Sequence, residues 1–239
     1  MKRSIIGGMA ALTFALGAPA AAQTIYFGEN QNPAGGVSGD PVNARASFLA
    51  ALSGVSTEDF SSVPLGSASA ALTFTGSAGA INGTLTGGGQ VVNAPVTGTF
   101  ATSATQFYDN QFSAFTVAFT SPIAAFGFYG TDVGDVNTAL QITLDSGLAS
   151  QRVFTVANTL NGNNGSLLFW GITDTANPFT TVTFAQSGSD RFGFDDLTVG
   201  DARQVTGGVP EPTTWAMMVL GFGAIGGAVR RRTAKISLA

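Results

Sequence analysis

The sequence predicts an all-β protein, a two-sheet β-sandwich of jelly-roll-like form with one short helix near its N-terminus. Charged residues make up only 10% of the chain, whereas glycine occurs 32 times and phenylalanine 19 times. This composition is typical of many short apolar strands joined by glycine turns. Apolar and polar residues also alternate in several segments, as in strands that bury one face. No helical pattern separates these segments, which disfavours a parallel α/β fold.

Residues 1–22 have the three parts of a cleavable signal peptide. The parts are a positive start, an apolar run and an A-x-A site: Lys2 and Arg3, residues 5–16, and Ala20, Ala21 and Ala22. We expect cleavage between Ala22 and Gln23 after export through the Sec translocon. A retained anchor is the alternative, but about a dozen apolar residues are too few to span a bilayer.

Residues 23–56 are predicted to form a loop followed by one short helix. Asparagine, glycine and proline are frequent in residues 29–39, which offer no core side chains. Asp40 suits the N-cap and Pro41 the first helical position, while Gly54 is a suitable terminator. We expect the helix to pack against the sheet.

Residues 57–200 are predicted to form the sandwich, with about eight to eleven strands separated by turns. The period of two is clearest where Phe115, Val117 and Phe119 alternate with smaller residues. Further candidate strands cover residues 123–129, 140–144, 152–156, 167–171, 180–184 and 191–199. Residues 201–209 are predicted to be a linker.

The predicted body is acidic. Between residues 23 and 209, four arginines oppose thirteen aspartates and glutamates, which gives a net charge of −9. This charge would repel phosphate backbones, so we expect no nucleic-acid partner. The chain also has no cysteine and no histidine. It therefore has no disulfides, no imidazole or thiolate zinc site, no Ser-His-Asp triad and no Cys-His pair.

The acidic clusters are the candidate functional groups. Asp132 and Asp135 lie in a glycine-bounded turn, and Asp195 and Asp196 are neighbours in the last predicted strand. Alternation would turn one of that second pair toward the core unless the strand bulges. A buried carboxylate needs a metal, an arginine or backbone donors. Two interpretations stay open: the aspartates cap turns, which is the commoner role, or they hold a structural calcium ion.

Catalysis would have to rely on carboxylates alone, as in glycosidases with paired acids. Further candidates for such a pair are Glu29, Glu58 and Asp59. Nothing in their spacing selects two of them. Among aromatic residues, the amphipathic members Tyr108, Tyr129 and Trp170 would suit a sugar-stacking platform, although the apolar run before Trp170 is more typical of a core position.

Residues 210–235 differ from the body. In order they contain a proline corner, a Trp-Ala pair, an uncharged apolar stretch and an arginine cluster: Pro210, Glu211 and Pro212; Trp215 and Ala216; residues 217–229; Arg230, Arg231 and Arg232. An apolar stretch followed by arginines is a stop-transfer pattern. As a helix, residues 213–229 would span about 25 Å, against a hydrocarbon core of about 30 Å. A short, glycine-bearing span suits a transient anchor better than a permanent one.

This order of motifs resembles the PEP-CTERM sorting signal in its PEPxxWA variety. The resemblance implies recognition and removal by an exosortase, a membrane cysteine protease of Gram-negative bacteria that make extracellular polysaccharide. An ordinary single-pass anchor is the alternative. Residues 125–135 and 193–200 resemble, more loosely, the body of many PEP-CTERM proteins. The predicted sandwich also resembles carbohydrate-binding jelly rolls in outline, which by itself implies no activity.

Together these features predict a non-catalytic exported envelope or extracellular-matrix protein. We expect it to be anchored transiently in the inner membrane and then to reach the cell surface or the medium. There it would associate with exopolysaccharide or biofilm by glycan binding or by structural association. A carbohydrate-active enzyme that uses paired carboxylates is the alternative.

We predict that tail processing requires the Pro210-Glu211-Pro212 corner. The prolines fix an extended, helix-free segment that a protease can bind at the membrane edge. Replacing all three residues with alanine should leave the tail attached when the protein is made in its own host, as measured by mass spectrometry. An unchanged mature C-terminus would show that the corner is not what the protease recognises.

Overall fold

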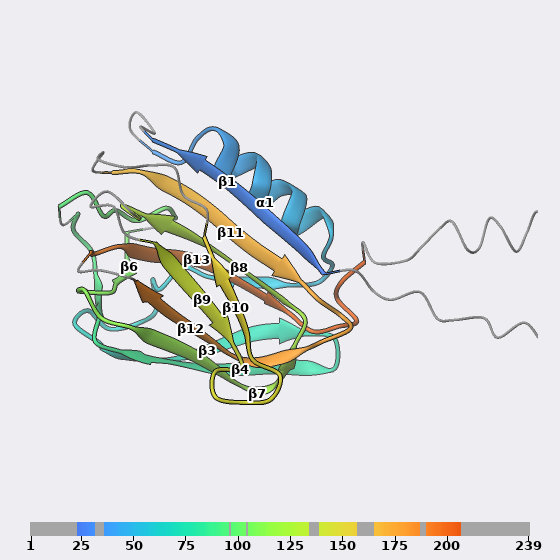
Figure 1. The fold of residues 1–239 in the computed structure, drawn as a ribbon. Helices are drawn as coiled ribbons and strands as arrows, with labels where there is room; N and C mark the ends of the chain where they lie inside the picture. Colours follow the sequence, from blue (N-terminus) through green and yellow to red (C-terminus); the bar gives the residue numbers. More distant parts are fainter. Residues whose placement is uncertain are drawn as a thin grey trace, which may run out of the picture. The chain divides into compact units, whose positions relative to one another are not determined.

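The computed structural model describes residues 23–31, 36–95, 97–103, 105–133, 139–156, 165–186 and 190–206. These residues form thirteen strands and one helix, and the strands build two antiparallel sheets that pack face to face (Figure 1). The predicted β-sandwich is therefore confirmed. Ala21–Val209 form one compact unit. The predicted signal peptide and sorting tail lie outside the described residues, and within the described ones no helix has the length and apolarity to cross a membrane.

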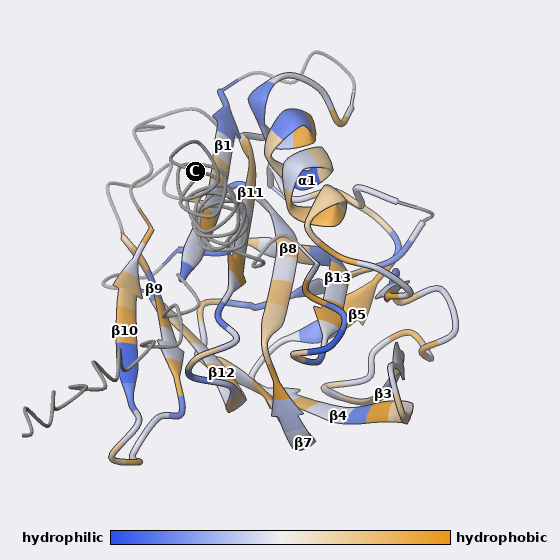
Figure 2. Cartoon of the chain, turned by 90° about the vertical axis from the view of Figure 1, so that its right-hand side faces the viewer, coloured by the Kyte–Doolittle hydropathy of each residue, from blue (hydrophilic) through white to orange (hydrophobic). Residues whose placement is uncertain are grey.

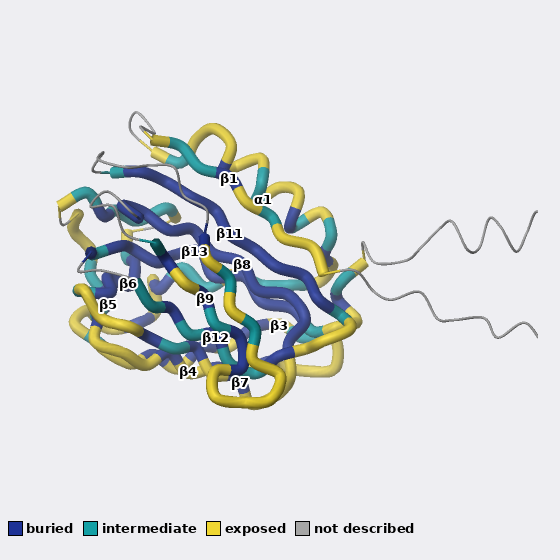
Figure 3. Tube along the Cα trace, in the orientation of Figure 1, coloured by how far each residue is buried: buried dark blue, intermediate teal, exposed yellow. Residues whose placement is uncertain are grey.

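The seven-stranded sheet has the order β1-β11-β8-β13-β6-β5, with β2 also paired to β13. Its strands are β1 (Thr24–Asn30), β2 (Ser56–Glu58), β5 (Gln90–Val92), β6 (Phe107–Asp109), β8 (Ala125–Thr131), β11 (Leu167–Thr173) and β13 (Gly193–Gly200). Every residue of β8, β11 and β13 is buried, which Figure 3 shows as dark tubes. These central strands are therefore covered on both faces.

The six-stranded sheet has the order β10-β9-β12-β7-β4-β3. Its strands are β3 (Ser69–Gly76), β4 (Gly79–Gly87), β7 (Phe115–Ile123), β9 (Leu140–Leu144), β10 (Arg152–Thr155) and β12 (Phe179–Gln186). From β7 to β13 the chain crosses between the two sheets after almost every strand, and only β9 and β10 stay in one sheet. This alternation is the jelly-roll-like arrangement that the sequence predicts.

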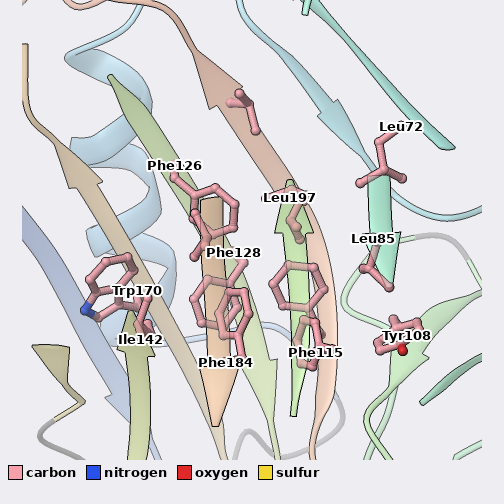
Figure 4. Close-up of a cluster of buried hydrophobic side chains, with 14 of the residues drawn as sticks. Leu72, Leu85, Tyr108, Phe115, Phe126, Phe128, Ile142, Trp170, Phe184 and Leu197 are labelled. Carbon is pink, nitrogen blue, oxygen red and sulfur yellow. The ribbon is translucent and has the colours of Figure 1, made fainter. Parts of the chain in front are cut away.

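Phenylalanine rings fill the space between the sheets. The rings of Phe115 and Phe184 on the six-stranded sheet stack with centroids 4.5 Å apart, and Phe184 also meets Phe194 of β13 edge to face at 5.1 Å. Figure 4 shows Phe126 and Phe128 of β8 in the same cluster. Such ring pairs add to the hydrophobic gain from burial. The alternation seen in the sequence places them all on the inner face.

Helix α1 (Asp40–Ala50) covers the outer face of the seven-stranded sheet, on the far side from β7, β4 and β3 (Figure 2). The fully buried Phe48 anchors it between Tyr26, at 5.5 Å between ring centroids, and Phe169, at 5.6 Å. Glycine is required beneath this ring because a Cβ at Gly127 would lie 2.7 Å from Phe48 Cε1. The helix therefore forms a second, smaller core.

The ends of α1 differ slightly from the prediction. Gly39, with φ 78°, is the N-cap, and Asp40 is the first helical residue rather than the cap. Glycine adopts this positive φ without strain. Asp40 lies in the first turn, where its negative charge interacts favourably with the positive end of the helix dipole. The helix ends at Ala50 instead of continuing toward Gly54.

Strands β1 and β2 were not predicted from the sequence; β1 lies within residues 23–56, and β2 begins at Ser56. Strand β1 pairs with β11 over its full length, from Thr24 opposite Thr173 to Asn30 opposite Leu167. It is an edge strand, and its Ile25 and Phe27 remain 39% and 36% exposed. A strand paired on one side and only partly buried needs no clean alternation. Its strand character therefore depends on a distant partner rather than on local pattern.

We predict that Val182→Ala in β12 lowers the free energy of unfolding by about 2 kcal/mol, because removing buried methyl groups leaves a cavity. Val182 is fully buried. For a body of this size the melting temperature would fall by about 4 to 8 °C.

The matched control is Val153→Ala in β10 of the same sheet, where the side chain is 52% exposed. Its effect should stay within about 0.5 kcal/mol. Equal losses in the two variants would contradict the inner and outer faces assigned to this sheet.

Candidate functional site

Strand β13 contains a bulge at the two aspartates that the sequence singled out. Its pairing with β8 shifts register between Asp195 and Thr198, and Asp196 has a positive φ of 54°. On its other edge, β13 pairs with β6 through residues 193–194 and with β2 through residues 197–199. On this edge the two aspartates lie in the gap between β6 and β2, while on the opposite edge Asp195 still pairs with Tyr129 of β8.

Both carboxylates lie on the outer face of the seven-stranded sheet, beside helix α1. The hydroxyl of Thr102 is 3.0 Å from Asp195 Oδ2 and 3.3 Å from Asp196 Oδ2. Arg45 of α1 reaches within 3.9 Å of Asp196 Oδ1. The exception stated for this pair therefore applies: because the strand bulges, neither carboxylate turns toward the inter-sheet core. The bulge adds one residue, so two consecutive side chains share a face before alternation resumes at the buried Leu197.

Asp195 anchors the loop that crosses this face. Its carboxylate accepts hydrogen bonds from the backbone N–H groups of Thr102 at 2.7 Å and Ser103 at 3.1 Å. The N–H of Asp196 donates to it at 2.7 Å. Asp195 is only 1% exposed. Burial raises its pKa to about 6, which the hydrogen bonds from the loop partly oppose and the charge of Asp196 reinforces.

Asp196 connects the bulge to the helix. Burial raises its pKa above the usual value, while the positive charge of Arg45 opposes that rise. The Arg45 guanidinium also lies over the ring of Tyr129, at 5.6 Å from its centroid. An arginine held between a carboxylate and an aromatic face is fixed in orientation. The bulge, the loop and α1 are therefore joined by polar contacts as well as by the apolar contacts of Phe48.

Asp132 organises a different pair of loops. It follows β8 with φ 64°, and its Oδ1 accepts the N–H of Gly165 at 2.7 Å. Its own N–H donates to the carbonyl of Ser166 at 2.8 Å. Gly98 approaches so closely that a Cβ there would collide with the Asp132 carboxylate. Asp135 lies outside the described residues.

Calcium binding stays a prediction. Among the described residues, no three or more acidic side chains converge as a metal site would require. The contacts of Asp195 come from N–H and O–H donors, which neutralise a buried carboxylate in place of a cation. The arrangement around the described aspartates is that of loop anchors and turn caps.

The other acidic candidates are held in turns or at a surface hollow. Glu58 accepts the N–H of Phe60 at 2.8 Å, and Asp59 accepts the N–H of Ser61 at 3.0 Å. Glu29 lies elsewhere, where β1 meets α1, and together with Asp40 it lines a cavity of about 380 Å³. The structure therefore does not bring Glu29, Glu58 and Asp59 together.

The three aromatic residues that would suit a sugar-stacking platform are all buried, so they form none, and the core position favoured for Trp170 is confirmed. Tyr108 is fully buried, and Tyr129 and Trp170 are each 3% exposed. Trp170 packs against Phe128 and Phe154, with centroid distances of 6.3 and 5.8 Å. The strands that carry these rings are covered on both faces, so a ring is buried whichever face of the strand it lies on.

Two buried ion pairs were not predicted from the sequence. Arg191 donates to Asp109 through both Nε and Nη2, and Arg152 donates to Asp174. Both carboxylates are fully buried, and their partners lie 82 and 22 residues away in the chain. Because the body has few cations and many carboxylates, the sequence indicated that each arginine would form an ion pair with a carboxylate. It did not indicate which carboxylate, because that depends on the sheet topology.

We predict that the protein loses stability as pH rises from 5 to 7.5. The pKa of Asp195 rises to about 6 on folding. Its protonated form therefore stabilises the folded state fully at a pH below the pKa of the unfolded chain, and this contribution is lost as the pH rises through about 6. The expected loss over this range is about 1 kcal/mol, or about 2 to 4 °C in melting temperature. In residues 23–209, Asp195→Asn should flatten this part of the profile.

Asp201→Asn is the matched control. Burial raises the pKa of Asp201, but hydrogen bonds from Ser77 and Arg203 bring it below the usual value, so its titration falls below this range. A profile as steep in Asp195→Asn as in the wild type would contradict the prediction.

Residues 23–209 also test calcium binding, since calcium at a hundredfold excess over its Kd would raise the melting temperature by about 5 to 10 °C. Equal midpoints in chelator, calcium and magnesium would rule calcium out.

Several solved structures are similar to part of this chain. They include the K2 cleaved adhesin domain of Lys-gingipain, with 12% identity, coverage of 61% of this chain and 98% of that chain, and a TM-score of 0.41. TmCBM61, solved with β-1,4-galactotriose, has 13% identity over 48% of this chain and 86% of that chain, with a TM-score of 0.28. A carbohydrate-binding module of family 29 has 14% identity over 49% and 81%, with a TM-score of 0.27.

The comparison with curated proteins finds no match to the chain. A family model does match residues 208–232, and it describes the PEP-CTERM protein-sorting motif. The matched residues contain every motif position of the signal predicted at residues 210–235, from the Pro210-Glu211-Pro212 corner to Arg232. The motif implies an exosortase as processing partner and export to the cell surface. The chain therefore carries a PEP-CTERM protein-sorting motif at residues 208–232.

Proposed function

We propose that this protein is a non-catalytic component of the extracellular matrix that associates with polysaccharide after an exosortase has removed its tail. The observation that carries the proposal is the sorting motif at residues 208–232, which accompanies a compact β-sandwich with its own core. The signal peptide and the Sec translocon account for export. The tail then anchors the chain in the inner membrane only until it is processed.

The state of the buried carboxylates supports a non-catalytic role. Asp109 and Asp174 are paired with arginines, and Asp195 is held by backbone N–H groups. A general acid or a nucleophile must face a space that a substrate can enter. These side chains instead fasten loops and strand ends.

Asp145 shows the same use of a carboxylate at the end of β9. It accepts hydrogen bonds from the N–H of Thr180 at 2.8 Å and from the hydroxyl of Ser150 at 2.9 Å. Although burial raises the pKa of Asp145, these hydrogen bonds bring it below the usual value. It therefore stays ionised as a structural acceptor.

One observation favours a carbohydrate-active enzyme as the second candidate. Glu29 and Asp40 both line the cavity of about 380 Å³ between β1 and α1. Two carboxylates at one hollow are the minimum that hydrolysis of a glycosidic bond requires. This hollow is where such an activity would be located.

A glycan array combined with a reducing-sugar assay on purified residues 23–209 tests the two functions. We expect binding to polysaccharide without release of reducing ends. Release of reducing ends that Glu29→Gln and Asp40→Asn abolish would support the enzyme instead. If neither binding nor turnover occurs, the polysaccharide part of the proposal fails.

A further inference from the structure

The outer face of the six-stranded sheet is uncharged and rich in threonine. Its outward side chains, taken from the alternating exposure along each strand, are Ser69, Ala71, Thr73 and Thr75 of β3; Ala80, Asn82, Thr84 and Thr86 of β4; Thr116, Ala118 and Thr120 of β7; Thr181, Thr183 and Ala185 of β12; Gln141 and Thr143 of β9; and Val153 and Thr155 of β10. All are exposed or half-buried. We call this surface the threonine face.

Strand register aligns these side chains into rows. One row crosses all six strands, as direct partners from Val153 through Thr143, Thr183, Thr116 and Thr86 to Ser69. Adjacent strands lie about 4.8 Å apart, so the row is about 24 Å long. In its centre the hydroxyls of Thr116 and Thr183 are 2.9 Å apart. A second row runs from Thr181 through Ala118 and Thr84 to Ala71; the hydroxyl oxygen of Thr181 is buried, so the accessible hydroxyl of this row is that of Thr84.

The absence of charge on these described strands is unusual for a solvent-facing sheet. Soluble proteins commonly place charged side chains on exposed faces and edge strands, where they favour solubility and oppose edge pairing. Here the nearby charges point elsewhere. Arg152 of β10 pairs with Asp174, and Asp145 after β9 is buried beneath its hydrogen bonds.

We propose that the threonine face binds an uncharged polysaccharide. The inference rests on the proposed association with extracellular polysaccharide and gives that association a site. Each threonine hydroxyl can donate one hydrogen bond and accept others, which matches a polymer that carries hydroxyl groups along its whole length. The threonine and alanine methyl groups supply small apolar contacts between the hydroxyls.

Charge determines which polymer fits. A polysaccharide with carboxylate or sulfate groups would have to desolvate them against a face that offers no cation. It would also be repelled by the acidic body. An uncharged polymer has no charged group to desolvate and is not repelled by the acidic body. Because this face has no aromatic ring for stacking, binding depends on several weak contacts along one chain, and it grows with polymer length.

A second copy of the protein fits this face less well. Two sheets pack face to face through interdigitated apolar side chains about 10 Å apart. The rows of hydroxyls would lose their water in such a contact, and each would have to find a partner. A polymer that brings its own hydroxyl groups supplies those partners.

The test uses the full chain, purified in detergent, and affinity electrophoresis in gels that contain one polysaccharide each. The probes are dextran, a soluble β-glucan and a galactomannan, with polygalacturonate as the acidic comparison. We expect retardation by at least one uncharged polymer, insensitive to salt, and none by polygalacturonate. The variant Thr84→Val with Thr86→Val keeps the shape and strand preference of both side chains and removes two hydroxyls.

This double variant should bind about tenfold more weakly, as expected for the loss of two ordinary hydrogen bonds. Thr84→Lys with Thr86→Lys should abolish retardation by uncharged polymers. The matched control is Thr24→Val with Thr206→Val, because both threonines are exposed and lie off the threonine face. It should bind like the wild type, and melting temperatures should confirm that all variants fold.

Three results would overturn the inference in distinguishable ways. If the wild type binds an uncharged polymer and both Thr84/Thr86 variants bind equally well, the site lies elsewhere and only the inference fails. If the wild type binds no polymer, the proposed association with polysaccharide fails with it. If the wild type binds no polymer but self-associates, and the variants do not, the face is a contact between copies.

Discussion

The contact between the two sheets through phenylalanine rings is the interaction on which the rest of the structure depends. The chain has no cysteine, so no disulfide reinforces the fold. The buried rings join the two sheets, together with polar contacts such as the N–H of Thr75 in β3 to the hydroxyl oxygen of Ser56 in β2 at 2.8 Å. The ring of Phe184 lies at the centre, in contact with Phe115 on its own sheet and with Phe126, Phe128 and Phe194 on the other. Every loop and every candidate site is positioned by strands that this cluster fixes.

Polar contacts of the aspartates also hold loops against the sandwich, and only some of these contacts involve the few arginines of the body. Arg45, Arg152 and Arg191 each pair with a buried carboxylate. Asp195 and Asp145 are stabilised instead by backbone N–H groups of neighbouring segments. A buried carboxylate without such partners would be costly. The aspartates therefore determine which loops can lie against the sandwich.

The two outer faces of the sandwich differ in what lies against them. Helix α1 and the loop around Thr102 cover the seven-stranded sheet, and they bring with them the bulge, its carboxylates and Arg45. The six-stranded sheet keeps its outward side chains exposed or half-buried and uncharged. The sorting motif indicates where the protein is sent, whereas the threonine face, as the described residues present it, is where contact with an uncharged partner would take place.

The sequence by itself determined the features that depend on local order along the chain. The alternation of residues such as Phe115, Val117 and Phe119 indicated strands with one buried face, and the Pro210-Glu211-Pro212 corner with its following motifs indicated the sorting signal. Both are readable because each motif is complete within a few residues. The all-β class follows from the same local patterns.

Only the tertiary structure decided the features that depend on partners distant in the chain. Strand β1 exists because β11 lies beside it, and Asp195 and Asp196 share a face because β13 bulges between β6 and β2. The rows of threonines arise from the register of six strands, which no single segment encodes. Pairing and register depend on how the apolar faces fit together across the whole sandwich, so a polar side chain's neighbours are settled only when the core has formed.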